Sequence, residues 1–298
     1  AASALGAILA VLASLIITAN VLVAIALLRL IQKGGSKGLY FILNLAVADT
    51  MVGFTVTGLV IDEFSQPFRP SQTFCVLRMA FVTSSSAASI MSLILVACDR
   101  HRAIRKPFHY FQLVTGLRVG VRLLGIWLVA AIIGFFPVLS QGFQRISHHE
   151  KCSFFKVFHP TYMLTVFCVG FFPALFLFIY LYCDMLKIAS VHVQHIREVE
   201  HAGLAGACPP SHTASDMKAM RTVAMLVGCF TLSWLPFFIA SIVQTICFEC
   251  FLYRVIENYL WVLGLCNSLL NPLLYSCWQK DVRLQLSQLA IGVKRKVL

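Results

Sequence analysis

The chain has 298 residues, of which 59% are hydrophobic and 12% are charged, and its mean hydropathy is +0.84. A soluble domain carries about 25% charged residues, so a surface wetted on all sides is excluded and a polytopic membrane protein is indicated. The net charge of +12 does not indicate nucleic-acid binding, because the basic residues cluster at the ends of apolar segments, as expected beside a cytoplasmic leaflet.

Seven apolar segments are each long enough to cross a hydrocarbon core of ~30 Å as a helix. Helices satisfy their own backbone groups in lipid, and these segments lack the alternation of β-barrel strands. The predicted fold is therefore an all-α membrane protein, a single seven-transmembrane domain over residues 1–298. An eighth, amphipathic helix is expected at about 279–291 on the inner leaflet. The predicted spans are 5–30, 39–61, 74–104, 117–139, 162–188, 219–246 and 255–278.

Lysine and arginine predict the orientation of these spans. Of the 24 Lys and Arg residues, 18 lie on the side that holds the loops after the odd-numbered spans. The positive-inside rule then puts the amino terminus outside and the carboxyl terminus in the cytosol. The first span has no basic segment ahead of it, so we expect no cleaved signal peptide.

In chain order, the first acid deep inside a span is Asp49. A carboxylate in lipid is unfavourable unless it is paired or hydrated, so it indicates a functional site. Amide and hydroxyl side chains at compatible depths would surround it with oxygen ligands of the kind that hard cations prefer. A protonated Asp49 bonded to hydroxyl groups is the alternative. The neighbours expected around it are Asn20, Ser89, Asn267, Ser268 and Asn271.

Two pairs of cysteines fall on the outer side. Cys75 begins the third span and Cys152 lies in the loop after the fourth, so a disulfide between them would pin that loop over the bundle. Cys247 and Cys250 have CxxC spacing without a second pair, which favours a small loop disulfide over a zinc site.

The third span ends in an acid beside a base, Asp99 and Arg100. The basic residues that follow, Arg102, Arg105 and Lys106, suit anchoring at the inner leaflet. Anchoring does not account for the acid, which indicates a second role for this end of the span.

The later spans contain prolines and one long connection. Each proline removes a backbone hydrogen bond and bends its helix, although proline is also simply tolerated in membrane helices. After the fifth span we expect a cytosolic helical extension ended by Gly203, and Ser215 as the N-cap of the sixth span. The prolines are Pro137, Pro173, Pro236 and Pro272.

Motifs stand in order in all seven spans: Asn20, "LNLAVAD", Cys75 with "DRH", Trp127, Pro173, "SWLP" and "NSLLNPLLY". Together they resemble the rhodopsin-like G-protein-coupled receptors along essentially the whole chain. Within that family, stretches such as "LRMAFVTSS" and "YCDMLKIAS" look like receptors for fatty-acid ethanolamides and lysophospholipids. The resemblance implies a plasma-membrane receptor with no catalytic residues, a lipid agonist, a stimulatory heterotrimeric G protein and a rise in cAMP.

The resemblance also implies roles for residues of the inner half. Asp99 and Arg100 correspond to an acid–arginine pair, and Asp216, at the foot of the sixth span, would accept Arg100 in a resting lock. Tyr275 corresponds to a tyrosine that swings inward on activation. His101 stands where the family usually has Tyr, and we assign it no role.

Further roles follow from the same resemblance. Ile90, Pro173 and Phe230 correspond to packing that connects the ligand site to the inner face, and Trp234 to the residue that senses the ligand. Beyond a possible allosteric sodium ion we expect no cofactor. The residues that correspond to the sodium site are Asp49, Ser89, Asn267 and Asn271.

The outer half predicts the class of ligand. Val82 stands where amine receptors carry an aspartate, and the seventh span has no lysine to form a retinal Schiff base. We expect Arg78 and Glu257 to form an internal pair, or else to snorkel to water, leaving an apolar cavity for an acyl chain with a small polar head. The predicted ligand-binding residues are Arg78, Val82, Thr83, Phe154, Phe155, Trp234, Phe237, Phe238, Glu257 and Trp261.

Two other classes of membrane protein fit less well. A transporter predicts repeated halves and a continuous charged path, and an intramembrane enzyme predicts paired catalytic groups at mid-depth. Only Asp49 lies deep, and it is surrounded by amides rather than by a second catalytic group.

Overall fold

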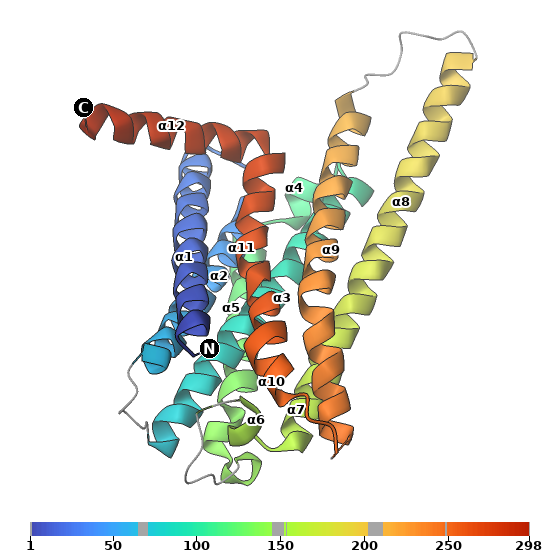
Figure 1. Cartoon of the computed structure of the whole chain (residues 1–298). Coiled ribbons are helices and arrows are strands. Elements are labelled where there is room, and N and C mark those ends of the chain that lie inside the picture. Colours follow the sequence, from blue (N-terminus) through green and yellow to red (C-terminus); the bar gives the residue numbers. More distant parts are fainter. Residues whose placement is uncertain are drawn as a thin grey trace.

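The computed structural model describes residues 2–64, 71–144, 152, 154–201, 211–247 and 249–297, and their regular structure is helical. Figure 1 shows long helices side by side, with the amino terminus at one end of the bundle and the carboxyl terminus at the other. The helices are α1 Ala2–Gln32, α2 Leu39–Phe64, α3 Gln72–Arg105, α4 Tyr110–Leu113, α5 Gly116–Leu139, α6 Phe154–Val157, α7 Pro160–Val166, α8 Phe172–His201, α9 Ser211–Ile246, α10 Tyr253–Val255, α11 Trp261–Trp278 and α12 Lys280–Val297.

Seven helical runs in the described part of the chain are long and apolar enough to cross a membrane. Their outward side chains are apolar, as in Leu128, Phe176 and Leu232, which are 55%, 67% and 76% exposed. Apolar exposure on this scale suits a lipid environment and not water. The seven runs are Ala4–Gln32, Leu39–Ile61, Gln72–Arg105, Gly116–Leu139, Pro160–His195, Met220–Ile246 and Tyr253–Cys277. The predicted fold class, a seven-helix bundle with an additional carboxyl-terminal helix, is confirmed.

Two of the spans contain a π-helical turn. Phe167–Phe171 joins α7 to α8 and ends two residues before Pro173, and Ile256–Leu260 joins α10 to α11. A π turn adds one residue to a helical turn and so rotates the side chains on either side relative to a regular helix. Hence the sequence spacing alone does not give which residues of these two spans face the bundle.

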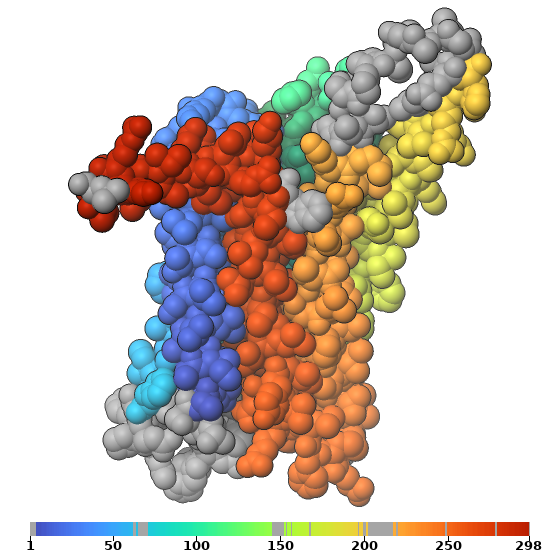
Figure 2. Space-filling model, turned by 45° about the horizontal axis from the view of Figure 1, so that its top comes forward, coloured from blue at the N-terminus to red at the C-terminus, as the bar shows by residue number. Residues whose placement is uncertain are grey.

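The carboxyl-terminal helix α12 lies across the end of the bundle beside α1 (Figures 1 and 2). Gln279 has extended backbone angles, which separate α12 from α11 and allow the change of direction. Val282 is fully buried and Leu286 and Leu289 pack on the core, as the predicted apolar face requires. The helix is longer than predicted: α12 continues to Val297 instead of ending near residue 291, and Val293 in this added part is 61% exposed.

The start of α9 also differs from the sequence expectation. The helix begins at Ser211, so Ser215 lies inside its first turns and is not the N-cap. Two prolines, Pro209 and Pro210, precede Ser211 in the sequence, and proline favours the beginning of a helix over its interior. The predicted helix end at Gly203 lies outside the described residues.

Candidate functional site

The third span, α3, connects the two ends of the bundle where candidate residues gather. We call them the Cys75 end and the Arg100 end, after residues at the beginning and at the end of α3. Between them, halfway along the bundle, lies Asp49 of α2.

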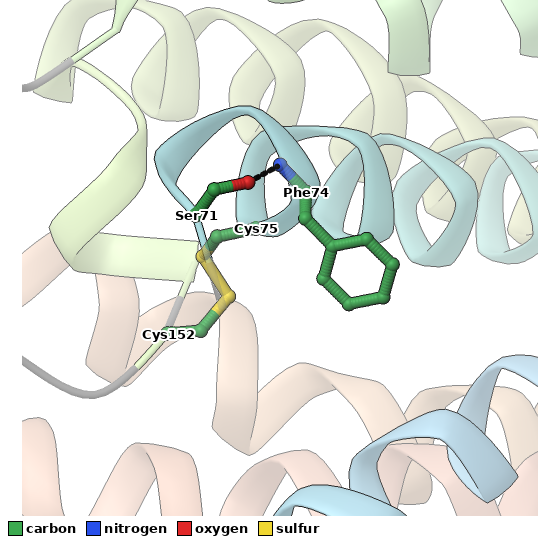
Figure 3. The surroundings of a disulfide bond; sticks show 4 residues. All are labelled: Ser71, Phe74, Cys75 and Cys152. Atoms are coloured by element: carbon green, nitrogen blue, oxygen red, sulfur yellow. Dashed lines mark hydrogen bonds between the residues drawn. A yellow bond between two sulfur atoms is a disulfide. The ribbon is translucent and has the colours of Figure 1, made fainter. Parts of the chain in front are cut away.

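A disulfide closes the Cys75 end. Cys75 and Cys152 are bonded, with their Cα atoms 5.7 Å apart, beside an N-cap in which Ser71 Oγ accepts a hydrogen bond from the backbone N–H of Phe74 (Figure 3). The predicted bridge is confirmed. It ties α6, which begins two residues after Cys152, to the beginning of α3.

Cys247 and Cys250 are also bonded to each other, so the CxxC motif forms a loop disulfide. The next residues are held by a second contact, because the backbone N–H of Leu252 donates to Gln244 Oε1 at 2.6 Å. The short connection from α9 to α10 is therefore closed twice, once covalently and once by a hydrogen bond.

Some of the residues predicted to bind the ligand pack against one another at the Cys75 end. Phe155 is 3% exposed and packs with its ring centroid 6.5 Å from that of Phe237, which in turn lies 5.6 Å from Trp234. Val82 is buried, whereas Thr83 and Trp261 are half-buried. The Thr83 hydroxyl donates to the carbonyl of Met79 on its own helix.

The same aromatic packing continues inward along rings that sequence reasoning missed. Phe171, 1% exposed, stacks on Phe238 with ring centroids 4.2 Å apart. The ring centroids of Phe171 and Phe178 each lie 5.4 Å from that of Phe230. Their inward direction depends on the π turn, which ends at Phe171, so the sequence carried no signal for it.

The predicted connector is formed differently from the sequence expectation. Phe230 is fully buried and Ile90 is half-buried against the core, but Pro173 is exposed. The rings in contact with Phe230 are Phe171 and Phe178. The proline therefore acts on the helix backbone, and phenylalanine side chains supply the packing.

The expected ion pair between Arg78 and Glu257 is not formed. Among the described residues no ion pair joins these two side chains, and Glu257 Oε1 is buried without a hydrogen-bond partner. The guanidinium carbon of Arg78 lies 4.7 Å above the ring centroid of Phe74, one turn earlier on α3, in cation–π geometry. Glu257 lies in the π turn Ile256–Leu260, whose added residue changes the direction of that side chain.

Asp49 is fully buried and accepts three hydrogen bonds from two other helices. Oδ1 accepts from Ser89 Oγ at 2.5 Å and from Ser268 Oγ at 2.9 Å, and Oδ2 accepts from Asn271 Nδ2 at 3.1 Å. Asn20 joins the cluster through its Nδ2 atom, which donates to the Ser268 carbonyl at 2.9 Å. α1, α2, α3 and α11 thus meet at one polar centre.

Two oxygen atoms of this centre, Oδ1 of Asn20 and of Asn271, are buried without a hydrogen-bond partner in the described part of the chain. On the same helix as Asn271, Asn267 Oδ1 and the Tyr275 hydroxyl are also buried without a partner among the described residues. Buried oxygens beside a carboxylate fit a hard monovalent cation, which would satisfy oxygen atoms that the protein leaves open.

A second polar network joins three helices near this centre. Trp127 Nε1 donates to Asn44 Oδ1 at 2.7 Å, and Asn44 Nδ2 donates to Ser92 Oγ at 2.7 Å. The tryptophan of the predicted fourth-span motif therefore cross-links α5, α2 and α3.

At the Arg100 end, Asp99 and Arg100 form the expected ion pair at 2.7 Å. Two neighbours that the sequence did not indicate complete it. Tyr110 of α4 donates its hydroxyl hydrogen to Asp99 Oδ1 at 2.8 Å, and Arg100 Nη2 lies 3.3 Å from the Tyr110 oxygen. Gly38, in the turn before α2, packs so closely that a Cβ atom there would lie 2.7 Å from Arg100 Nη2.

Tyr110 keeps its proton under all physiological conditions. Burial, reinforced by the negative charge of Asp99, raises the pKa of its hydroxyl to about 12. The hydroxyl therefore remains a donor to Asp99 at any physiological pH.

The structure describes only in part the other residues expected to act with Arg100. Asp216 lies in the first turns of α9, but its side chain is outside the described residues, so its contact with Arg100 stays a prediction. Tyr275 is 1% exposed in α11. His101, to which the sequence assigned no role, has a partner: its Nε2 atom lies 2.6 Å from Asp184 Oδ2 on α8. A lone acid close to the basic end of a span was the signal that could have drawn attention to Asp184.

With this geometry in place, comparison with known proteins shows the family. Residues 19–275 match the 7 transmembrane receptor (rhodopsin family). The chain is 56% identical over 292 residues to the glucose-dependent insulinotropic receptor of Homo sapiens, covering 97% of this chain and 87% of that receptor. It is 54% identical over 290 residues to the same receptor of Rattus norvegicus, covering 97% of this chain but 62% of the rat protein, less than two thirds of its length.

A third relative extends the likeness beyond this receptor. The 5-hydroxytryptamine receptor 4 of Rattus norvegicus is 31% identical over 289 residues, covering 90% of this chain and 71% of that receptor. Similarity of this extent, together with seven spans and the motifs in order, leaves one conclusion: the chain belongs to the rhodopsin family of G-protein-coupled receptors.

Proposed function

We propose that the protein is a receptor for lipid-like agonists, namely fatty-acid ethanolamides and lysophospholipids, and that it acts through the stimulatory G protein to raise cAMP. Members of the family are receptors and not enzymes, and a heterotrimeric G protein is their partner. The relatives from Homo sapiens and Rattus norvegicus are named for a glucose-dependent insulinotropic action. We extend that role, insulin secretion, to this chain.

The observations that carry the choice of ligand are the packed aromatic rings at the Cys75 end, which we call the aromatic wall, and the valine at position 82. The rings of the wall, Phe155, Phe237, Phe238 and Trp234, are each 7% exposed or less. Amine receptors need a carboxylate at the Val82 position to bind a cationic ligand, and a valine cannot supply one. An acyl chain gains free energy from apolar contact without a counter-ion, so this wall favours a lipid over an amine.

Signal transfer follows the same packed path. We propose that the agonist displaces Trp234, that the buried rings of Phe230, Phe171 and Phe178 pass the shift along α8 and α9, and that Arg100 is released from its resting contacts. Asp216 is the proposed resting partner of Arg100 on α9, and Tyr275 the side chain that moves inward.

The location we propose is the plasma membrane, with the amino terminus outside and the carboxyl terminus in the cytosol. Two independent features support it. The positive charges concentrate at the Arg100 end, and both disulfides of the described residues lie at the Cys75 end, where an oxidising compartment would preserve them. α12 would then rest on the inner leaflet and contact membrane lipids through Leu284 and Ile291, 48% and 57% exposed.

We further propose that the centre around Asp49 holds a sodium ion, with Asp49, Ser89, Asn267 and Asn271 as the residues that surround it. A bound cation there would stabilise the packed, resting arrangement of the three helices.

Agonist binding measured in sodium chloride and in choline chloride tests the proposed sodium site. Sodium is expected to lower agonist affinity in the wild type, by roughly fivefold or more, and to have no effect in Asp49→Asn. Equal sodium effects in both proteins would exclude the site.

Two other functions remain as alternatives. A rhodopsin-family receptor for another small apolar ligand, with a different G protein, would share the aromatic wall and the Asp99–Arg100 pair. A transporter is disfavoured by the single deep acid and by its three hydrogen bonds to serine and asparagine.

The decisive experiment is to measure cAMP in cells that express the chain, with and without oleoyl ethanolamide. We expect a ligand-dependent rise that serotonin does not produce.

Arg78→Ala should weaken the response to the lipid by roughly tenfold, since it removes the cation one turn before Val82 on α3. Thr165→Ala, which changes an exposed hydroxyl on α7, is the matched control and should leave the response intact. A solute flux without any cAMP change would contradict the receptor function, and an unchanged response in Arg78→Ala would contradict the ligand position.

A further inference from the structure

His101 makes a contact between helices that lie far apart in the chain. Its Nε2 atom lies 2.6 Å from Oδ2 of Asp184, 83 residues later, and so joins the last turns of α3 to the middle of α8. The two side chains are only 10% and 25% exposed. Because the carboxylate can only accept a hydrogen bond, the imidazole donates through Nε2 whether or not it is charged.

The surroundings favour a strong contact at this point. Arg105 shares a face of α3 with His101, one turn further on, and its Nη1 atom lies 3.9 Å from the same Asp184 oxygen. Lys187, one turn after Asp184 on α8, adds positive charge near the carboxylate. A hydrogen bond to an ionised, partly buried carboxylate is stronger than a neutral one.

This contact is separate from the acid–arginine pair beside it. Asp99 and Arg100 turn toward Tyr110 and Gly38, that is, toward α4 and the turn before α2. His101 follows them directly in the sequence but turns toward α8, because consecutive residues on a helix point about 100° apart. No atom is shared between the two contacts, so each can open without the other.

The position of Asp184 means that a movement there is larger at the end of α8. α8 continues beyond it to His201, a length of roughly 25 Å at 1.5 Å per residue. A small change of tilt at Asp184 therefore displaces the exposed end of α8, which we place on the G-protein side, by a much larger distance.

We propose that the His101–Asp184 contact is a latch that holds α8 against α3 and limits signalling in the absence of agonist, independently of the Asp99–Arg100 pair. This inference rests on the proposed function for its signalling readout, but not for its structural one. His101 and Asp184 are positioning residues, because their proposed part is to hold α8 against α3.

The first test compares agonist-free G-protein activation at equal surface expression, with dissociation sensors that cover all G-protein classes. His101→Phe and Asp184→Ala should each raise basal activation by roughly fivefold or more, and His101→Asp, which places two carboxylates together, should raise it further. The exchange His101→Asp with Asp184→His restores an acid–imidazole pair and should return basal activation toward the wild-type level. His192→Phe, which replaces an exposed histidine on α8, is the matched control and should leave basal activation at the wild-type level.

The second test does not depend on any G protein. Spin labels introduced through non-natural amino acids at Leu117 of α5 and Val193 of α8, both exposed, report how far α8 stands from the rest of the Arg100 end. We expect a longer or broader distance distribution in His101→Phe and in Asp184→Ala, and recovery in the exchanged pair. An unchanged distribution, or an exchanged pair that behaves like His101→Asp alone, would overturn the latch. If the wild type fails to respond to lipid while the distances still change, the proposed ligand is wrong and the latch stands.

Discussion

At the scale of single residues, the Arg100 end depends on one position without a side chain. Gly38 lies so close to the ion pair that a Cβ atom there would meet Tyr110 Oη at 2.6 Å, Arg100 Nη2 at 2.7 Å and Asp99 Oδ2 at 2.8 Å. Each of these separations is shorter than real Cβ contacts, so a side chain at position 38 forces the three polar groups to move. The acid–arginine pair is therefore held by the shape of the preceding turn as well as by charge.

We expect Gly38→Ala to raise basal signalling by roughly fivefold, because Arg100 must leave its place beside Asp99 and Tyr110. Agonist-free cAMP at equal surface expression measures this. Gly125→Ala, where nothing lies within 4 Å of the added atom, serves as the control and should match the wild type. Basal cAMP in Gly38→Ala indistinguishable from this control would contradict the role of the turn.

At the scale of helices, close crossings decide how the spans pack. α5 approaches α3 at Gly134, where a Cβ atom would collide with Ser84 Oγ and lie 2.6 Å from the Ala80 carbonyl oxygen. Small residues let membrane helices come this near, and the backbone on the other side cannot yield as a flexible side chain can. The Trp127–Asn44–Ser92 hydrogen bonds join the same helices, so the crossing is defined by both shape and polarity.

Gly134→Ala should therefore separate α3 from α5 and destabilise the protein by about 1–3 kcal/mol, the usual range for overpacking. Thermal unfolding in detergent, followed by tryptophan fluorescence, should show a lower Tm. Gly120→Ala lies on the same helix, with nothing within 4 Å of the added atom, and should leave the Tm unchanged or slightly higher. A Tm for Gly134→Ala equal to that of Gly120→Ala would mean that the crossing adjusts without strain.

At the scale of the whole molecule, the two ends are held by different means. The Cys75 end is closed covalently, by a disulfide between residues 77 apart in sequence and another between residues 3 apart. The Arg100 end is held by hydrogen bonds and ion pairs, which can exchange for others of similar strength. A molecule built in this way is able to change shape at the Arg100 end while the Cys75 end stays closed.

The two disulfides should differ in their effect on stability. In the chain-entropy description, closing the long loop stabilises by about 4.5 kcal/mol and closing the short loop by about 2 kcal/mol. Replacing Cys75 and Cys152 by serine should thus lower the Tm and the surface expression clearly more than replacing Cys247 and Cys250. If the short-loop pair proves the more damaging, the disulfides act mainly through local packing and not through loop closure.

The sequence by itself determined the membrane class, the seven spans, the orientation expected from positive charges, the disulfide at Cys75 and the residues around Asp49. These features depend on composition, length and residue type, which a chain carries whatever its packing. Only the tertiary structure decided which side chains meet: His101 with Asp184, Gly38 with Arg100, Phe171 with Phe230, and Arg78 with Phe74 in place of Glu257. Those contacts depend on how the helices are rotated and how closely they are spaced. π turns change the rotation and glycines at helix crossings change the spacing, and the helical periodicity of the sequence reveals neither change.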